Sequence, residues 1–176
     1  MVSSRMMSDN TMEYSIEKAS LGDEQTLAYI QTESWKSAFK DILDADILER
    51  CTNFERVTSM YKRLLEQNKG NGYILKINDK PHCIAWWDET REKDMPGYAE
   101  LICIHSLPDN RRKGLGSRMI YRILSDMALA GYSKAMLWVF KENIAARRFY
   151  EANGFITDEK QKPGIYPIEI CYERII

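Results

Sequence analysis

Apolar and polar residues follow one another along this chain in patterns that predict a mixture of strands and helices. The region from Glu13 to Lys18 has the polar-apolar texture of a short first strand. Asp23 is placed to cap a helix whose apolar positions recur at helical spacing, namely Leu27, Ile30, Trp35, Ala38 and Phe39. A second helix is predicted from about Asn53 to Gln67, and the segment 68–72, with its two glycines, ends it.

The middle of the chain predicts strands. Tyr73–Ile77 and His82–Trp87 flank the turn Asn78–Pro81, which is typical of a β-hairpin. The charged segment Asp88–Gly97 contains a Pro-Gly pair and is predicted to be a loop. The next strand, Tyr98–Ser106, is nearly all apolar, as expected for a strand that is covered on both faces.

The second half of the chain predicts a strand-helix-strand unit. A long helix from about Gly114 to Ala130 has a core-facing stripe made by Leu115, Met119, Ile123 and Met127. The strand Lys134–Phe140 follows, and it should lie parallel to the strand that precedes the helix. A shorter helix is predicted at Ile144–Ala152, and Phe155–Thr157 and Ile168–Arg174 read as the closing strands.

Composition narrows the class of protein. The 176 residues are 44% hydrophobic and 29% charged, which is typical of a soluble globular chain. Because 25 basic and 26 acidic residues nearly cancel, no global attraction to nucleic acid or to membranes is expected. Residues 1–12 are polar and are expected to form a loose N-terminal arm, and residues 13–176 to form one domain.

The cysteines do not predict a metal site. Cys51, Cys83, Cys103 and Cys171 are far apart, no Cys-x-x-Cys occurs, and the chain has only two histidines. Buried thiols in a reducing compartment are the simpler interpretation. The first residues lack the apolar stretch of a signal peptide, and no segment approaches the ~20 apolar residues of a membrane span. We therefore expect a cytoplasmic protein.

The strongest chemical signal follows the strand Tyr98–Ser106, where two glycines open a helix. A helix start exposes unpaired N–H groups and the positive end of the helix dipole. The absence of side chains at Gly114 and Gly116 would allow an anion to approach those groups, and Arg111, Arg112 and Lys113 add positive charge. This pattern predicts a seat for a phosphorylated ligand, and a pyrophosphate fits it well.

Two motifs together resemble the GNAT superfamily of acyl-CoA-dependent N-acyltransferases. The first is Arg111-x-x-Gly114-x-Gly116 after an apolar strand, and the second runs from Asn143 through Phe149-Tyr150 to Gly154-Phe155. The resemblance implies an α/β (α+β) fold, with a mixed, mostly antiparallel central sheet, a splayed parallel strand pair and flanking helices. A Rossmann dinucleotide site is disfavoured, because the glycine spacing differs and several strands and helices precede the strand-helix-strand unit.

The resemblance also implies acetyl-CoA as acyl donor. The pyrophosphate would lie on N–H groups between Arg112 and Ser117, and the pantetheine arm would pair with the strand near Ile104 and Ser106, where it splays from its parallel neighbour. The expected cofactor-binding residues are Ile104, His105, Ser106, Arg111, Arg112, Lys113, Gly114, Leu115, Gly116, Ser117 and Asn143. Asn143 is equally well placed to cap the following helix.

Two catalytic residues are carried over from the family. Tyr150 matches a tyrosine that protonates the departing thiolate in the family. The alternative interpretation is that Tyr150 packs in the core beside Phe149 and has no catalytic role. Glu100 matches a general base for the amine, and burial should then raise its pKa; the alternatives are an exposed strand end or a structural partner for a lysine or arginine. His105 falls on the face opposite Ile104 and is a weaker candidate for the base.

The expected function is transfer of an acetyl group to a primary amine by direct attack in a ternary complex, with a small-molecule acceptor. The alternatives are a protein N-terminal or lysine acetyltransferase and a CoA-binding sensor module without catalysis. The acidic residues in Asp88–Asp94 would either attract a cationic amine or belong to a solvated loop. Trp86 and Trp87 would either line the acceptor cleft or pack in the core. Family analogy adds a homodimer as an expectation.

Overall fold

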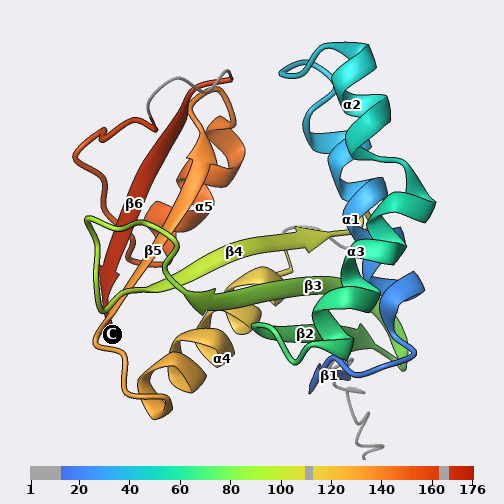
Figure 1. Ribbon diagram of the computed structural model, residues 1–176, viewed down its shortest axis with the longest axis horizontal. Helices are drawn as coiled ribbons and strands as arrows, with labels where there is room; N and C mark the ends of the chain where they lie inside the picture. Colours follow the sequence, from blue (N-terminus) through green and yellow to red (C-terminus); the bar gives the residue numbers. More distant parts are fainter. Residues whose placement is uncertain (1–12, 110–112, 163–166) are drawn as a thin grey trace, which may run out of the picture.

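Six strands form one sheet in chain order in the computed structural model, which describes residues 13–109, 113–162 and 167–176 (Figure 1). The strands are β1 (Tyr14–Lys18), β2 (Asn71–Ile77), β3 (Lys80–Glu89), β4 (Ala99–Ser106), β5 (Lys134–Phe140) and β6 (Glu169–Ile175). All neighbouring strands are antiparallel except β4 and β5, which are parallel. The mostly antiparallel sheet with one parallel pair is therefore confirmed.

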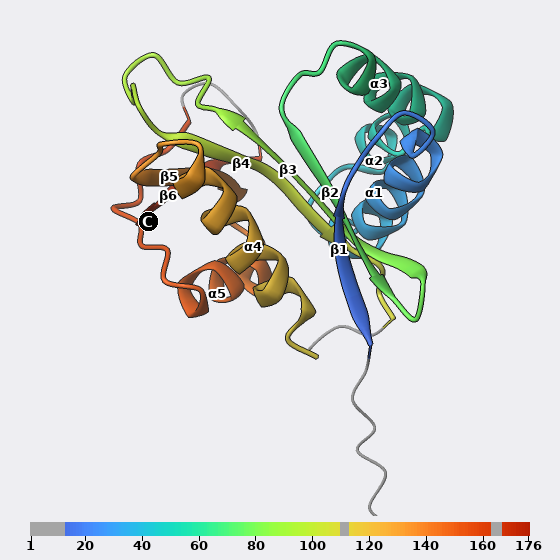
Figure 2. The same cartoon turned by 90° about the horizontal axis from the view of Figure 1, so that it is seen from below.

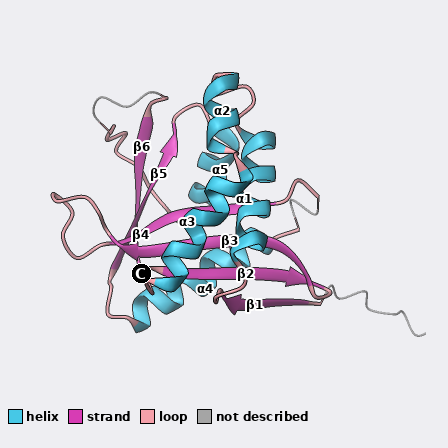
Figure 3. Ribbon diagram, turned by 45° about the vertical axis from the view of Figure 1, so that its right-hand side comes forward, coloured by secondary structure: helices cyan, strands magenta, loops and turns pink. Residues whose placement is uncertain are grey.

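The described residues form five helices, four of which cover the two faces of the sheet (Figure 2). They are α1 (Glu24–Ala38), α2 (Ala45–Cys51), α3 (Phe54–Glu66), α4 (Leu115–Leu129) and α5 (Ile144–Ala152). Helices α4 and α5 lie on one face, and α1 and α3 lie on the other (Figures 2 and 3). None of these helices is long and apolar enough to cross a membrane.

A separate apolar core lies under each helical layer. The predicted stripe on α4 is confirmed, because Leu115, Met119, Ile123 and Met127 are all buried against β2–β6. On the other face, α1 and α3 pack Leu27, Ile30, Val57 and Tyr61 against Ile74 and Trp86. Trp86 and Trp87 are both buried in the core, so the packing interpretation of this pair is confirmed.

Most predicted elements are confirmed, and three expectations are corrected. Helix α2 was not predicted, because none of its residues is buried and it therefore carries no apolar periodicity. Phe155–Thr157 is not a strand but contributes one isolated bridge between Ile156 and Glu173. Strand β4 is covered on both faces only over its first part, since Ala99–Leu101 are buried but Ile102 is 37% exposed.

Candidate functional site

The parallel strands β4 and β5 separate soon after they begin to pair. Only Ala99 with Ala135 and Glu100 with Met136 are in register, although β4 continues to Ser106 and β5 to Phe140. The other edge of β4 stays paired with β3 as far as Ser106, so the sheet opens on one side of β4 alone. Main-chain N–H and C=O groups on the separated inner edges are thus available to a ligand. This confirms the splay expected near Ile104.

A β-bulge in β4 lies at the point of separation. Trp86 pairs with Cys103 but Trp87 pairs with Leu101, which leaves Ile102 as the extra residue. A bulge bends its strand and changes the direction of the side chains that follow. Beyond it, Ile104 packs toward the core under α4 and α5.

The N-terminus of α4 follows the end of β4 in the chain. Gly114 is the N-cap in a left-handed conformation, with φ of 75°, and no side chain caps the helix. The first intrahelical hydrogen bond runs from Arg118 N to Gly114 O at 3.1 Å. The N–H groups of Leu115, Gly116 and Ser117 precede that bond, as at any helix start, and the binding of an anion to them stays a prediction. Arg111 and Arg112 lie outside the described residues, and Lys113 is exposed.

Gly116 has a packing reason that the sequence did not reveal. A Cβ atom at this position would lie 3.0 Å from Cε2 and 3.1 Å from Cζ of Phe149 on α5. By contrast, a Cβ at Gly114 would meet open space, and only the positive φ requires glycine there. The two glycines therefore serve different purposes, close packing of α4 on α5 and the turn into α4.

Asn143 caps α5. Its Oδ1 accepts a hydrogen bond from Ala146 N at 3.2 Å, which is the standard geometry of an N-cap. The capping alternative from the sequence is therefore what the structure shows, and a contact between Asn143 and a cofactor stays a prediction.

Tyr150 faces the sheet from α5. The side chain is buried in the core, and its ring lies 5.4 Å from that of Phe149 and 5.9 Å from that of Phe155. Burial raises the pKa of Tyr150, and the neighbouring thiols of Cys103 and Cys83 raise it further. The phenol is consequently protonated at neutral pH and can act only as a proton donor.

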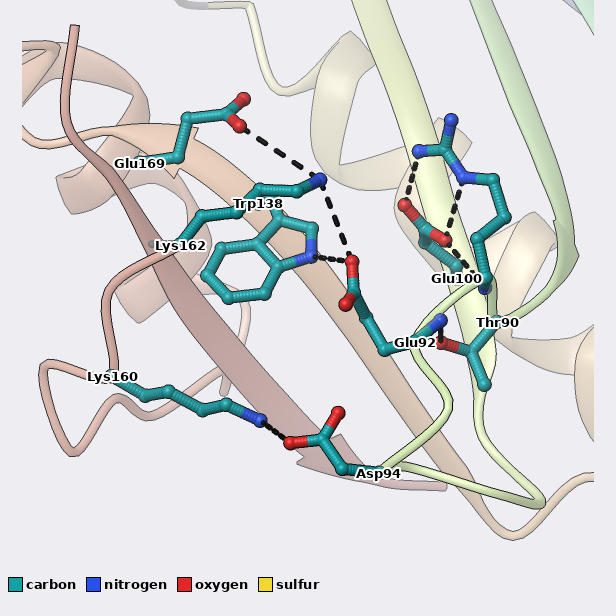
Figure 4. A network of polar contacts seen from close by, with 9 residues as sticks. Thr90, Glu92, Asp94, Glu100, Trp138, Lys160, Lys162 and Glu169 are labelled. Atoms are coloured by element: carbon teal, nitrogen blue, oxygen red, sulfur yellow. Dashed lines mark hydrogen bonds and ion pairs between the residues drawn. The ribbon is translucent and has the colours of Figure 1, made fainter. Parts of the chain in front are cut away.

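Glu100 is buried and paired with Arg91 (Figure 4). Its Oε2 accepts hydrogen bonds from Arg91 N at 3.1 Å and Arg91 Nε at 3.0 Å, and its Oε1 accepts one from Arg91 Nη2. Burial raises the pKa of Glu100, but the hydrogen bonds and charge of Arg91 outweigh burial and leave this pKa below its usual value. The expected rise toward neutrality is therefore wrong, and the structural-partner alternative describes the geometry.

His105 lies on the face opposite Ile104, as predicted, and it packs against α1. Its Nε2 accepts a hydrogen bond from Trp35 Nε1 at 3.3 Å, so the ring proton lies on Nδ1. Burial lowers the pKa of His105 to about 4. A neutral imidazole whose Nε2 is already occupied is a poor general base.

An aromatic cluster, which sequence reasoning did not assemble, spans the separated strands. Trp35 and Phe39 of α1 are 4.9 Å apart between ring centroids, Phe39 lies 5.1 Å from Phe140 of β5, and Trp35 lies 6.2 Å from His105 of β4. Periodicity predicts that Trp35 and Phe39 lie on the buried face of one helix, but it does not reveal which strands that face contacts. The cluster joins α1 to both sides of the splay.

The loop between β3 and β4 is an ion-paired segment. Glu92 accepts a hydrogen bond from Trp138 Nε1 at 3.0 Å and pairs with Lys162 at 3.4 Å, while Asp94 pairs with Lys160 at 2.7 Å (Figure 4). The acidic residues in 88–94 are therefore partly neutralised by cations from the segment that precedes β6. Among the described residues, no group of three or more His, Cys, Asp or Glu side chains is arranged to hold a metal ion.

Comparison with known proteins agrees with this geometry. The model of the acetyltransferase (GNAT) family matches residues 35–155. A spermidine N(1)-acetyltransferase from Thermoplasma acidophilum is 24% identical over 153 residues, which cover 84% of this chain and 91% of the relative. An uncharacterised N-acetyltransferase from Methanocaldococcus jannaschii is 29% identical over 108 residues, which cover 57% of this chain and 45% of the relative.

Two solved structures share the fold. The PaiA N-acetyltransferase from Thermoplasma acidophilum, in complex with coenzyme A, superposes with a TM-score of 0.76 at 18% identity, covering 94% of this chain and 100% of that one. The acetyltransferase YncA from Salmonella typhimurium, with acetyl-CoA, gives a TM-score of 0.67 at 16% identity, covering 92% and 93%. Since the family model spans most of the chain, from the first helix to the turn after α5, this protein belongs to the acetyltransferase (GNAT) family and is an N-acetyltransferase.

Proposed function

We propose that this protein transfers an acetyl group from acetyl-CoA to a primary amine of a small-molecule acceptor, by direct attack in a ternary complex. The observation that carries the proposal is the opening between β4 and β5, together with the uncapped N-terminus of α4 that follows β4. An extended ligand with amide groups and a terminal pyrophosphate matches both features.

The residues of the opening suit acetyl-CoA. The open edge of β4 near Ile104 and Ser106 offers main-chain partners for the pantetheine amides. The N–H groups of Leu115, Gly116 and Ser117 offer a seat for the pyrophosphate, and Lys113 and Ser117 are exposed beside it. Coenzyme A in the PaiA structure and acetyl-CoA in the YncA structure support the same donor here.

The transfer itself needs few protein groups. The amine nitrogen attacks the thioester carbon, the carbonyl oxygen gains negative charge, and the carbon–sulfur bond then breaks. We assign stabilisation of the oxyanion to a main-chain N–H near Ile104, and protonation of the departing thiolate to the Tyr150 hydroxyl. The amine gives up its proton to Glu100 or to water, and the lowered pKa of Glu100 favours water.

The acceptor belongs on the α1 side of β4. His105 lies there against α1, with the aromatic cluster of Trp35, Phe39 and Phe140 beside it, and Glu100 lies five residues earlier on the same strand. Aromatic faces suit a cationic amine, and a carboxylate on the same strand adds attraction. The similarity to a spermidine N(1)-acetyltransferase makes polyamines the first acceptors to test.

An acetyl-transfer assay tests the proposal. Acetyl-CoA is supplied with polyamines, aminoglycosides, amino acids or peptides, and release of free CoA is measured together with the mass of the product. Amine-dependent release and an N-acetylated small molecule are expected. Acetylated peptides alone would overturn the small-molecule assignment. Stabilisation by acetyl-CoA without transfer to any amine would favour a CoA-binding sensor module.

A further inference from the structure

The pair of Arg91 and Glu100 is unusually asymmetric. The side chain of Glu100 is only 2% exposed, whereas that of Arg91 is 62% exposed. Arg91, in the loop between β3 and β4, donates three hydrogen bonds to the Glu100 carboxylate. A buried carboxylate that loses its partner becomes costly to keep ionised, so Arg91 decides the charge state of Glu100.

The backbone of Arg91 is held in place on both sides. Thr90 N donates to Tyr98 O at 3.0 Å, which closes the base of the loop. Glu92 is fixed by Trp138 and Lys162 (Figure 4). Met95 is buried against Met136. The main-chain N–H of Arg91 is therefore directed at Glu100, and the exposed guanidinium is held by its own two hydrogen bonds to the carboxylate.

Other charges also face Glu100. Lys162 lies close enough to lower the pKa of Glu100, and Glu169 of β6 interacts with Glu100, Arg91 and Glu92. Asp88 of β3 stands opposite Glu100 in the β3–β4 register. Arg91 lowers the pKa of Glu100 more than Lys162 does, through its side-chain and main-chain hydrogen bonds as well as its charge. The guanidinium is consequently the dominant stabilising charge.

We propose that Arg91 is a positioning residue that keeps Glu100 ionised and holds its carboxylate in one orientation on the acceptor side of β4, an inference that rests on the proposed function. Glu100 then acts as a fixed anion that attracts and orients the ammonium group of the acceptor. Nε and Nη2 of the guanidinium each bind one carboxylate oxygen, and a lysine side chain lacks this fork.

Two measurements test the charge state of Glu100, an NMR titration of its carboxyl group and the pH dependence of turnover. Carboxyl carbons of labelled glutamates are titrated by NMR in the wild type, Arg91→Ala and Arg91→Lys, and the signal of Glu100 is assigned with Glu100→Gln. We expect Arg91→Ala to raise the midpoint of Glu100 by roughly one to three pH units and Arg91→Lys to give an intermediate value. Lys93→Ala, an exposed cation on the same loop, is the matched control and should leave the midpoint unchanged.

The pH profile of kcat/KM for the acceptor should follow the titration. Protonation of the acceptor amine lowers the rate equally in both proteins, so the ratio of the Arg91→Ala rate to the wild-type rate isolates Glu100. This ratio should fall at a pH where Glu100 of the wild type is still ionised. Unchanged midpoints and profiles in Arg91→Ala would overturn the inference. If no variant transfers acetyl groups, the proposed function fails, yet the NMR titration still decides the role of Arg91. Arg91→Lys supplies that titration if Arg91→Ala does not fold.

Discussion

The hydroxyl of Tyr150 is the group on which the proposed chemistry depends most. Burial raises its pKa, so the phenol remains a proton donor over the whole working range of pH. We expect Tyr150→Phe to lower kcat by about 10²–10⁴-fold, because a positioned acid contributes that much, while the Kd for acetyl-CoA changes little.

Tyr172→Phe is the matched control for Tyr150→Phe. Its ring centroid lies 6.4 Å from that of Tyr150, but its hydroxyl donates to Glu151 and accepts from Arg147. Removing that hydroxyl should affect stability more than turnover. Steady-state kinetics with saturating acceptor separate the two variants, and equal turnover in Tyr150→Phe and the wild type would remove the acid assignment.

His105 makes stability depend on pH at the residue scale. Since burial lowers its folded pKa to about 4 from an ordinary 6.5, the unfolded chain binds a proton that the folded chain rejects between these values. The contribution of His105 to the free energy of unfolding is complete above pH 6.5 and is lost as the pH falls toward 4. We expect urea unfolding to show a loss of roughly 2–3 kcal/mol over this window, and His105→Gln to remove that part of the slope. An identical slope in His105→Gln would contradict the assignment.

Helix α4 depends on close approach to α5 at the element scale. We expect Gly116→Ala to destabilise the fold by about 1 kcal/mol, because the added methyl group would lie 3.0 Å from the ring of Phe149 and this crowding outweighs the gain in helix propensity. Thermal melts measure the effect. The double variant Gly116→Ala with Phe149→Leu should recover part of the loss, since the smaller side chain leaves room. No recovery would mean that the ring is not the obstacle.

The elements of this chain were predictable where one face of each is buried. The stripe on α4, the hairpin of β2 and β3 and the boundaries of β5 and α5 follow from periodicity and turn residues. Helix α2 buries no residue and gave no signal. The bulge at Ile102 was equally hidden, because an almost wholly apolar strand has no alternation that could reveal a shift in register.

At the scale of the whole molecule, the motifs predicted the family and the fold, and both predictions are confirmed. The glycine pattern and the run from Asn143 to Phe155 predicted the family, the splayed strands and the helix start. A lysine or arginine partner for Glu100 was one of the alternatives, but its identity as Arg91 was not predictable, because the pair joins a loop to a strand through side chains nine residues apart. The contact of Phe39 with Phe140 joins residues about a hundred positions apart, and no local pattern encodes it.

Binding of acetyl-CoA should stabilise the whole fold. A ligand present at ~100 times its Kd adds about 2.7 kcal/mol to the free energy of unfolding, which a thermal melt detects easily. We expect acetyl-CoA and free CoA to raise Tm and NADPH to leave it unchanged, since the glycine spacing at 114–116 is not that of a dinucleotide site. A rise with NADPH alone would contradict the identity of the ligand.

Hydrogen–deuterium exchange with and without acetyl-CoA tests the central claim most directly, because it reports where the donor lies. Our account predicts slower exchange of the N–H groups near Ile104 and Ser106, at the start of α4 from Leu115 to Ser117, and little change in β1 and β2. Protection confined to other places, such as the hollow of about 530 Å³ beside Lys18 and Arg122, would contradict the placement of the cofactor between β4 and β5.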